Sequence, residues 1–191
     1  MLNLSNTYFS FIFVLSLQFP MKEKEEPEQN EKDKKDPIKV LLADDDKDDQ
    51  HLFKEALDHT SVPTELTTTD NGHELMDNLH DPEIPNPDII FLDINMPGKN
   101  GKECLKEIKA DDDLKDIPTV MYTTSTSEQD IDEAFKTGAN LYVPKPYSFS
   151  SIIIVLKNIF TLKWTQFYKK PDKKDFVLSE KTVDVKNQEA F

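Results

Sequence analysis

Short apolar runs recur along the chain from residue 38 onward, and each is followed by a stretch whose apolar residues return every third or fourth position. The runs have the length of buried β-strands, whereas the spacing that follows them is that of one face of an α-helix. Clusters of Asp, Asn, Pro and Gly separate the two kinds of stretch and mark turns. The predicted strands are 38–43, 65–69, 89–92, 118–123 and 140–143.

An amphipathic helix is predicted after each of these strands. The apolar faces carry Leu52, Phe53, Ala56 and Leu57; Leu75, Met76 and Leu79; Leu105 and Ile108; Ile131, Ala134 and Phe135; and Phe149, Ile152, Ile153, Leu156, Ile159 and Phe160. Ser127, with Asp130 three residues later, has the spacing of a capping box for the fourth helix. Gly138 is placed to end that helix, because glycine readily adopts the left-handed conformation of a helix terminus.

This alternation of strands and helices predicts an α/β fold. Parallel strands need crossover connections, and right-handed crossovers place helices on both faces of the sheet. We therefore expect a doubly wound, five-stranded parallel sheet, with all four glycines in the connections between its elements.

Polar residues follow four of the five predicted strands. Asp44 and Asp45 come after the first strand, Asp93 after the third, Thr123 closes the fourth and Lys145 follows the fifth. The carboxyl ends of parallel strands share one edge of a sheet, so these side chains are expected to converge in one crevice. Three crowded carboxylates repel one another and need a cation, and an incomplete set of oxygen ligands suits a hydrated Mg²⁺.

Other titratable residues are interpreted as structural. Asp46, Asp48 and Asp49 are expected to cap the first helix and to favour its dipole, with no catalytic role. The four histidines show no spacing suited to a metal or a catalytic triad, and we expect them at the surface. They are His51, His59, His73 and His80.

Composition and charge exclude one class of partner. The net charge is −14, and all 23 basic residues are lysines, because the sequence contains no arginine. Arginine is the usual reader of guanine edges, so direct binding of nucleic acid is disfavoured. The single cysteine, Cys104, excludes an internal disulfide, suits a reducing compartment and is expected to be a packed thiol on a helix face.

The two ends of the chain differ from its centre. Residues 1–20 carry no charge, but they lack the basic start and cleavage site of a signal peptide and are short for a membrane span. Residues 21–37 have the composition of a disordered leader. Met21 is interpreted as the natural start and residues 1–20 as an upstream translation artefact, with an N-terminal anchor at 1–20 as the alternative. Residues 38–168 are expected to form one domain and 169–191 a charged tail, with no output domain attached.

Four motifs, in order, resemble those of response-regulator receiver domains of two-component signalling. They are L-L-A-D-D-D, F-L-D-I-N-M-P-G-K-N-G, P-T-V-M-Y-T-T-S and Y-V-P-K-P, each at the end of a predicted strand. The resemblance extends from about Ile38 to Trp164 and implies a flavodoxin-like sheet with strand order 2-1-3-4-5. It also implies a stand-alone, cytoplasmic response regulator, which labels itself with phosphate but is not a conventional enzyme.

The resemblance implies a role for each residue of the crevice. Asp93 resembles the phosphoacceptor, which takes a phosphoryl group from a histidine kinase or a phosphotransfer protein. Asp45 looks like a direct Mg²⁺ ligand and Asp44 one acting through water, with the carbonyl of Asn95 completing the set. Lys145 is similar to the lysine that pairs with the phosphoacceptor, and its bond to Pro146 is expected to be cis.

The resemblance also implies an output surface. Thr123 and Tyr142 resemble a switch in which the hydroxyl moves toward the phosphate and the aromatic ring turns inward. The face from Ser127 to Phe160 would then change, and we expect it to bind a downstream protein or a second copy of the chain. The aromatic stretch 164–168 is expected to pack on the domain or to bind that partner, and binding to a membrane is not expected.

Two other functions are weighed. A phosphohydrolase of the haloacid-dehalogenase type would carry a second aspartate two residues after its nucleophile, but that position is Asn95, which cannot transfer a proton. The chain also lacks a cap domain. A degenerate receiver that serves only as a binding module is the other alternative, and the complete set of crevice residues disfavours it.

Overall fold

The computed structural model describes residues 36–161 and 172–179. Its strands form one parallel sheet with the order β2-β1-β3-β4-β5, which confirms the expected topology. The strands are β1 Ile38–Ala43, β2 Thr64–Thr69, β3 Ile89–Leu92, β4 Thr119–Thr123 and β5 Leu141–Pro144. The predicted bounds differ from these by one residue at most.

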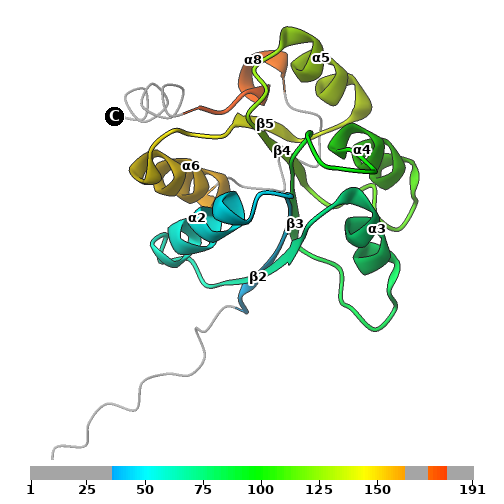
Figure 1. Cartoon of the computed structure of the whole chain (residues 1–191), viewed down its shortest axis with the longest axis horizontal. Coiled ribbons are helices and arrows are strands. Elements are labelled where there is room, and N and C mark those ends of the chain that lie inside the picture. The colour runs from blue at the N-terminus through cyan, green and yellow to red at the C-terminus, as the bar shows by residue number, and fades with distance from the viewer. Residues whose placement is uncertain (1–35, 162–171, 180–191) are drawn as a thin grey trace, which may run out of the picture. The chain divides into compact units, whose positions relative to one another are not determined.

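Helices cover both faces of the sheet (Figure 1). They are α2 Lys47–Asp58, α3 Gly72–His80, α4 Gly101–Ala110, α5 Glu128–Thr137, α6 Phe149–Thr161 and the short α8 Lys173–Phe176. Helices α2 and α6 pack on one face, and α3, α4 and α5 pack on the other, as a doubly wound sheet requires.

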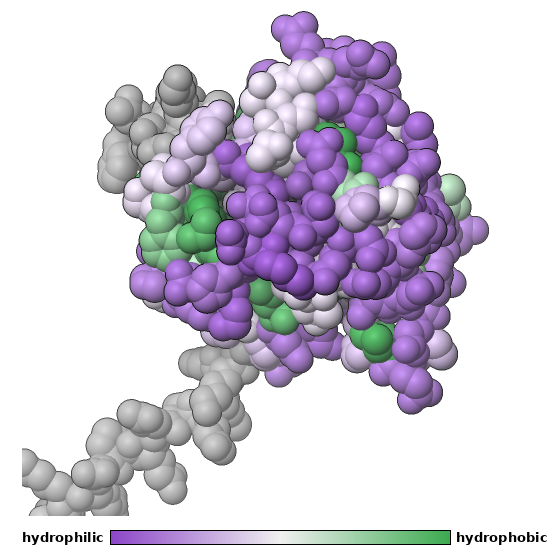
Figure 2. All heavy atoms as spheres, viewed as in Figure 1, coloured by the Kyte–Doolittle hydropathy of each residue, from purple (hydrophilic) through white to green (hydrophobic). Residues whose placement is uncertain are grey.

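Each face of the sheet has its own hydrophobic core. Alternate residues of a strand point to opposite faces, so Val40 and Leu42 join the core under α2 and α6, while Leu41 joins the other. Phe53 of α2 meets Phe91 of β3 edge to face, with ring centroids 4.9 Å apart. The outer surface is mostly hydrophilic, with small apolar patches such as the one over α6 in Figure 2.

Two expectations about helix ends have different outcomes. Gly138 ends α5 with a φ of 108°, which confirms its predicted role. The capping box at Ser127 was wrong: within the described residues the Ser127 side chain makes no capping hydrogen bond. Asp130 accepts instead from the Ser125 hydroxyl and pairs with Lys102 of α4.

Two of the four glycines lie inside helices rather than in connections. Gly72 and Gly101 are the first residues of α3 and α4, so the expectation that all four are connecting residues was wrong for this pair. A Cβ on Gly101 would lie 2.0 Å from the carbonyl oxygen of Asp93. Only glycine permits so close an approach of backbone to backbone, and this approach brings the start of α4 against the end of β3.

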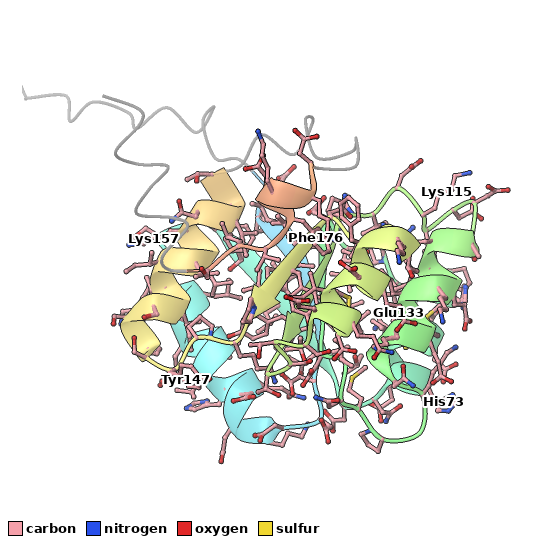
Figure 3. The ribbon with its side chains drawn as sticks, turned by 90° about the horizontal axis from the view of Figure 1, so that it is seen from above. His73, Lys115, Glu133, Tyr147, Lys157 and Phe176 are labelled. Carbon is pink, nitrogen blue, oxygen red and sulfur yellow. The ribbon has the colours of Figure 1, made fainter. Side chains whose placement is uncertain are left out.

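Part of the expected tail packs on the domain. Phe176 is fully buried and Leu178 is nearly so, and the Leu178 N–H donates to the carbonyl of Tyr142 at 2.9 Å. Figure 3 shows Phe176 beside β5, between α5 and α6. Residues 172–179, the C-terminal segment, therefore contribute to the core of the domain, although they do not form a fold of their own.

The remaining parts of the chain lie outside the described residues. These parts include residues 1–20, the leader at 21–35 and the aromatic stretch 164–168. The choice between an N-terminal anchor at 1–20 and a natural start at Met21 therefore stays open. Within 36–161 and 172–179, no helix is both long and apolar enough to cross a membrane.

Candidate functional site

Two of the strand ends place buried carboxylates side by side. The Asp93 N–H donates to the carbonyl of Ala43 at 2.9 Å, and the Asp44 N–H donates to the carbonyl of Thr69 at 3.0 Å. These bonds continue the hydrogen-bond ladder of the sheet past the strands, so both side chains lie at the carboxyl ends of the strands. Both residues are buried, with an exposed fraction of 0% for Asp44 and 4% for Asp93. Asp45 is exposed beside them, and the three carboxylates each offer an oxygen within 4.8 Å of the others.

The Lys145 ammonium lies among these carboxylates. Its Nζ is 2.7 Å from Asp44 Oδ2, 3.0 Å from Asp93 Oδ2 and 2.7 Å from Asp49 Oδ2. The Lys145 N–H donates to the carbonyl of Thr123 at 2.8 Å, which fixes the end of β5 next to β4. The convergence of Lys145 with Asp44 and Asp93 was expected from the sequence.

The expected cis bond between Lys145 and Pro146 was wrong. Among the described residues every peptide bond is trans. The lysine still reaches the crevice, because its long side chain leaves the backbone at the carboxyl edge of the sheet, where Thr123 holds its N–H.

Asp49 is the site residue that the sequence analysis missed. Of the three acidic residues assigned to capping, Asp46 does cap α2, because its Oδ1 accepts from the N–H groups of Asp48 and Asp49 at 2.8 and 3.2 Å. Asp49 itself turns toward the crevice and pairs with Lys145. The available signal was its place in the first turn of the predicted helix, close in sequence to Asp44 and Asp45.

Burial and charge set the ionisation of the crevice. Burial raises the pKa of Asp44 to about 6, although Lys145 and the Asp46 N–H act in the opposite direction. Burial alone would lower the pKa of Lys145, but hydrogen bonds to Asp44 and Asp49 and the charge of Asp93 raise it above its ordinary value. Lys145 therefore remains an ammonium at neutral pH and balances part of the acidic cluster.

The donor set fits a divalent cation. Asp44 Oδ2 is buried, and the partner that the described residues give it is the Lys145 ammonium at 2.7 Å. Three carboxylates with one lysine leave an excess of negative charge, and hard oxygen donors suit Mg²⁺, Mn²⁺ or Ca²⁺. The Asn95 N–H donates to Asp93 Oδ1 at 3.2 Å, which brings the backbone of Asn95 to the same crevice.

Thr123 and Tyr142 lie behind the crevice and are linked through one loop residue. Both are fully buried. The Ser125 N–H donates to Thr123 Oγ1 at 3.3 Å, and the Tyr142 hydroxyl donates to the Ser125 carbonyl at 3.0 Å. The Tyr142 ring is thus already turned inward in the structure, and the loop after β4 connects it to the threonine.

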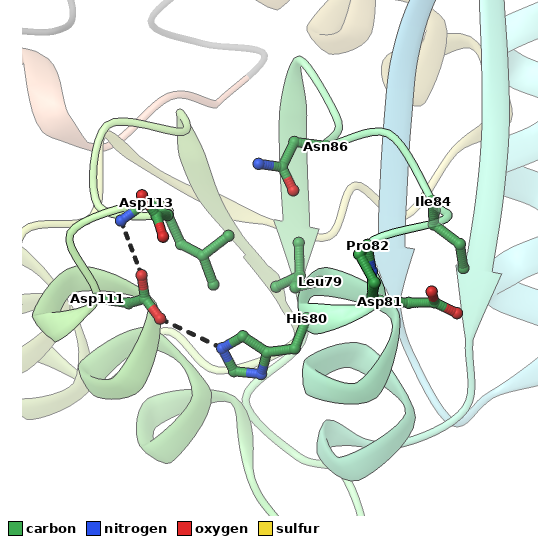
Figure 4. Close-up of a pocket in the computed structure, with 9 residues that line it drawn as sticks. Leu79, His80, Asp81, Pro82, Ile84, Asn86, Asp111 and Asp113 are labelled. Carbon is green, nitrogen blue, oxygen red and sulfur yellow. Dashed lines mark hydrogen bonds and ion pairs between the residues drawn. The ribbon is translucent and has the colours of Figure 1, made fainter.

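The crevice is open to solvent. It has a volume of about 480 Å³ and is lined by Asp45, Asp46, Lys47, Asp48, Asp49, Asp93, Thr124 and Lys145. A second hollow of about 450 Å³ lies between the end of α3 and the loops before β3 and β4, where His80 pairs with Asp111 at 3.3 Å (Figure 4). These loops precede the strands, so this hollow lies at the amino ends of the strands. The acidic site lies at their carboxyl ends, and the hollow is not part of it.

The histidines and the cysteine behave as expected. All four histidines are exposed. Cys104 is buried, and burial raises the pKa of its thiol to about 11. It is a packed thiol and not a nucleophile, because the thiolate is disfavoured at neutral pH.

A model of the response regulator receiver domain matches residues 40–157. The chain belongs to the receiver domain family. It is similar to the response regulator Rcp1 of Synechocystis sp., with 35% identity over 132 residues that cover 66% of this chain and 90% of Rcp1. It is also similar to the chemotaxis protein CheY of Pseudomonas aeruginosa, with 31% identity over 64% of this chain and 96% of CheY. These relatives contain little besides the matched domain.

Solved structures agree with this assignment. The phosphorylated cyanobacterial phytochrome response regulator RcpA superposes with a TM-score of 0.62 and 34% identity, over 72% of this chain and 98% of RcpA. The Mn²⁺-bound form of Rcp1 gives 0.61 and 32%, over 71% and 100% of the two chains. The receiver domain of this chain is thus a phosphoacceptor of two-component signalling with a divalent metal site, and a kinase is its phosphoryl source.

Proposed function

We propose that Asp93 is the residue that accepts the phosphoryl group. The observation that carries this assignment is its place in the cluster: it is nearly buried at the end of β3, 3.0 Å from the Lys145 ammonium and within 4.8 Å of the other carboxylates. Asp45 is exposed and Asp44 is fully buried, so Asp93 alone of the three combines an ammonium partner with access from the crevice.

The reaction is an in-line displacement at phosphorus. A carboxylate oxygen of Asp93 forms the new P–O bond, and the P–N bond to the histidine of the kinase breaks. The imidazole leaves with the electron pair of that bond and takes a proton from solvent. Lys145 offsets the charge of the phosphoryl oxygens, and before the reaction it pairs with Asp44 and Asp49.

We propose Mg²⁺ as the metal. Asp45 and Asp93 would bind it directly, Asp44 through water, and the Asn95 carbonyl would complete the protein ligands. When bound, the ion neutralises charge on the transferring group and on the crowded carboxylates. The oxygen donors and the open, hydrated crevice support this choice, because Mg²⁺ keeps several waters.

Thr123 and Tyr142 form the proposed switch. When a phosphoryl oxygen is present, the Thr123 hydroxyl turns toward it and releases the Ser125 N–H, so the loop after β4 moves. Tyr142 follows this loop through its bond to the Ser125 carbonyl. The output surface is the face formed by α5, β5 and α6, from Ser127 to Phe160, and its partner is a downstream protein or a second copy of the chain.

Labelling with acetyl phosphate tests the assignment. We expect wild type to be labelled in Mg²⁺ and unlabelled in EDTA, and Asp93→Asn to remain unlabelled in both. Asp45→Asn should lose Mg²⁺ binding and therefore should not be labelled. Asp48→Asn, which removes one charge from the same acidic turn, should label normally. A labelled Asp93→Asn protein would show that another carboxylate is the acceptor.

A further inference from the structure

The peptide group between Asp44 and Asp45 is held by an uncharged side chain that does not line the crevice. Gln50 of α2 is buried, with an exposed fraction of 7%, and its Nε2 donates to the Asp44 carbonyl at 2.6 Å. The Asp44 N–H donates to the Thr69 carbonyl at 3.0 Å. Both backbone groups of Asp44 therefore have a partner, one from the end of β2 and one from α2.

The same amide nitrogen of Gln50 reaches a third element. Nε2 also donates to Asp70 Oδ1 at 2.9 Å, in the loop after β2. Lys47 pairs with this carboxylate as well, and the bonds from Lys47 and Gln50 hold the pKa of Asp70 below its ordinary value. A carbonyl and a carboxylate can only accept, so the amide nitrogen has to face them, and the amide oxygen is left to face Lys47 Nζ at 3.5 Å. Gln50 thus links α2 to the end of β1 and to the loop after β2.

The Asp45 side chain has no comparable support. It is exposed, and no hydrogen bond or ion pair within residues 36–161 and 172–179 holds it. Its position is therefore set by its backbone. A peptide group is planar, so the bond that holds the Asp44 carbonyl also fixes the plane of the Asp45 N–H and the direction in which the chain continues into Asp45. Gln50 acts on Asp45 through this one peptide group.

We propose that Gln50 is a positioning residue of the metal site, whose side-chain amide holds the Asp44–Asp45 peptide group so that the Asp45 carboxylate faces those of Asp44 and Asp93. This inference rests on the ligand role proposed for Asp45, but it involves no phosphoryl group. Positioning matters because the three carboxylates repel one another without a cation, and an exposed side chain can turn away to solvent. Residues that orient metal ligands from behind affect metal affinity by about tenfold or more.

The role requires hydrogen-bond donors and nothing else from the side chain. The two acceptors are the Asp44 carbonyl and the Asp70 carboxylate. Arginine carries several donors and can serve both acceptors, whereas leucine has a similar size to glutamine and no donor. Gln50→Leu therefore leaves the peptide group free to rotate, and Gln50→Arg keeps it held.

Titration of the metal-free, full-length chain with Mn²⁺, without any phosphodonor, tests the proposal. We expect the dissociation constant for Mn²⁺ to rise about tenfold in Gln50→Leu and to return close to the wild-type value in Gln50→Arg. Thr60→Val is the matched control, because it removes another buried hydrogen bond, from Thr60 Oγ1 to the Leu57 carbonyl at the far end of α2, and should bind Mn²⁺ as wild type does. Equal weakening in Gln50→Leu and Thr60→Val, or binding by Gln50→Arg as weak as that by Gln50→Leu, would overturn the role of Gln50.

Asp45→Asn separates this inference from the function on which it rests. We expect this variant to bind Mn²⁺ at least as weakly as Gln50→Leu does, because it removes the ligand itself. Wild-type affinity in Asp45→Asn would show that the ligand role of Asp45 is wrong. Wild-type affinity in Gln50→Leu, with Asp45→Asn impaired, would show that only the role of Gln50 is wrong.

The wild-type chain provides a second test that does not depend on the folding of a variant. In nuclear magnetic resonance spectra the side-chain amide protons of Gln50 should exchange slowly with solvent, because Nε2 donates to two acceptors. Mg²⁺ should shift the backbone amide signal of Asp45 and leave the Gln50 side chain protected, since the peptide group that it holds stays in place. Exchange at the rate of an exposed glutamine, with or without Mg²⁺, would overturn the proposal.

Discussion

The Lys145 ammonium lies 2.7 Å from the carboxylate of Asp49, which comes from the first turn of α2. The same ammonium lies 3.0 Å from Asp93, so the lysine that is expected to meet the phosphoryl group is shared with a fourth acidic residue. Asp49 adds negative charge to a crevice that must accept an anionic donor. It also holds the lysine between α2 and the end of β3.

Asp49→Asn should therefore speed labelling by acetyl phosphate. The change removes one negative charge and leaves Lys145 free to meet the phosphoryl oxygens. Asp49 is partly exposed and screened by water, so we expect an increase of about three- to tenfold at saturating Mg²⁺. Initial labelling rates measure it, and Asp48→Asn is the matched control for charge. Slower labelling of Asp49→Asn would show instead that the carboxylate positions Lys145 for the reaction.

The pKa of Asp44 gives a prediction about stability in the absence of metal. The pKa is about 6 in the folded chain, because the carboxyl is buried, and its ordinary value is 3.8. Between these values the folded state binds a proton that the unfolded state has lost. The contribution of Asp44 is thus present below about pH 4 and decreases as the pH rises through 6.

Asp44→Asn should remove this pH dependence. In EDTA at pH 7 we expect the free energy of unfolding to increase by about 1–3 kcal/mol relative to wild type, with a smaller difference at pH 4.5. The amide oxygen can still accept from the Asp46 N–H, so the turn is retained. Urea unfolding at the two pH values provides the measurement. The same difference at both pH values would contradict a buried, ionised Asp44.

Gly101 controls the position of Asp93. In Gly101→Ala the new Cβ would meet the Asp93 carbonyl oxygen, and backbone cannot move aside as a flexible side chain does. We expect a loss of about 2–4 kcal/mol in the free energy of unfolding and a loss of labelling by acetyl phosphate.

Gly138→Ala provides the control for that loss. Its strained φ should also destabilise the chain, but it lies at the end of α5, away from the crevice. If both variants label equally well at a temperature where both are folded, the contact between Gly101 and Asp93 does not serve the site.

The proposed switch predicts a specific change in amide exchange. Beryllofluoride with Mg²⁺ should speed exchange in residues 123–127 of wild type, because Thr123 Oγ1 releases the Ser125 N–H when it turns toward the bound group. Thr123→Ala should show no beryllofluoride effect while Asp93 still labels, and Thr124→Ala, an exposed neighbour, should respond as wild type. An unchanged response in Thr123→Ala would place the switch elsewhere.

The fold was predictable because its signals are local. Apolar runs and helical spacing predicted the alternating elements and nearly all strand bounds, and the resemblance to receiver domains implied the strand order. The positions of the strand ends brought Asp44, Asp93 and Lys145 together. Asp49 was missed because a carboxylate in the first turn of a helix can either cap the helix or form an ion pair with a residue of the crevice. Only the orientation of α2 about its axis, relative to the sheet, decides between the two roles.

Two other features depend on distant parts of the chain. Ser127 has the spacing of a cap, but Asp130 pairs instead with Lys102 of α4, a partner that the local sequence does not reveal. Phe176 stands in a charged stretch without helical or strand periodicity. Its burial depends on contacts with Tyr142 and Phe135, which are far from it in the sequence.

The two edges of the sheet differ in their protection against aggregation. β2 has exposed Thr and Glu side chains along its length, which make it a poor template for other strands. β5 is fully buried at Leu141, Tyr142 and Val143 and is shielded by Phe176 and Leu178 of its own chain. Proteolysis before residue 172 would therefore expose an apolar edge, and the product should form insoluble aggregates even though every residue of the acidic crevice is intact.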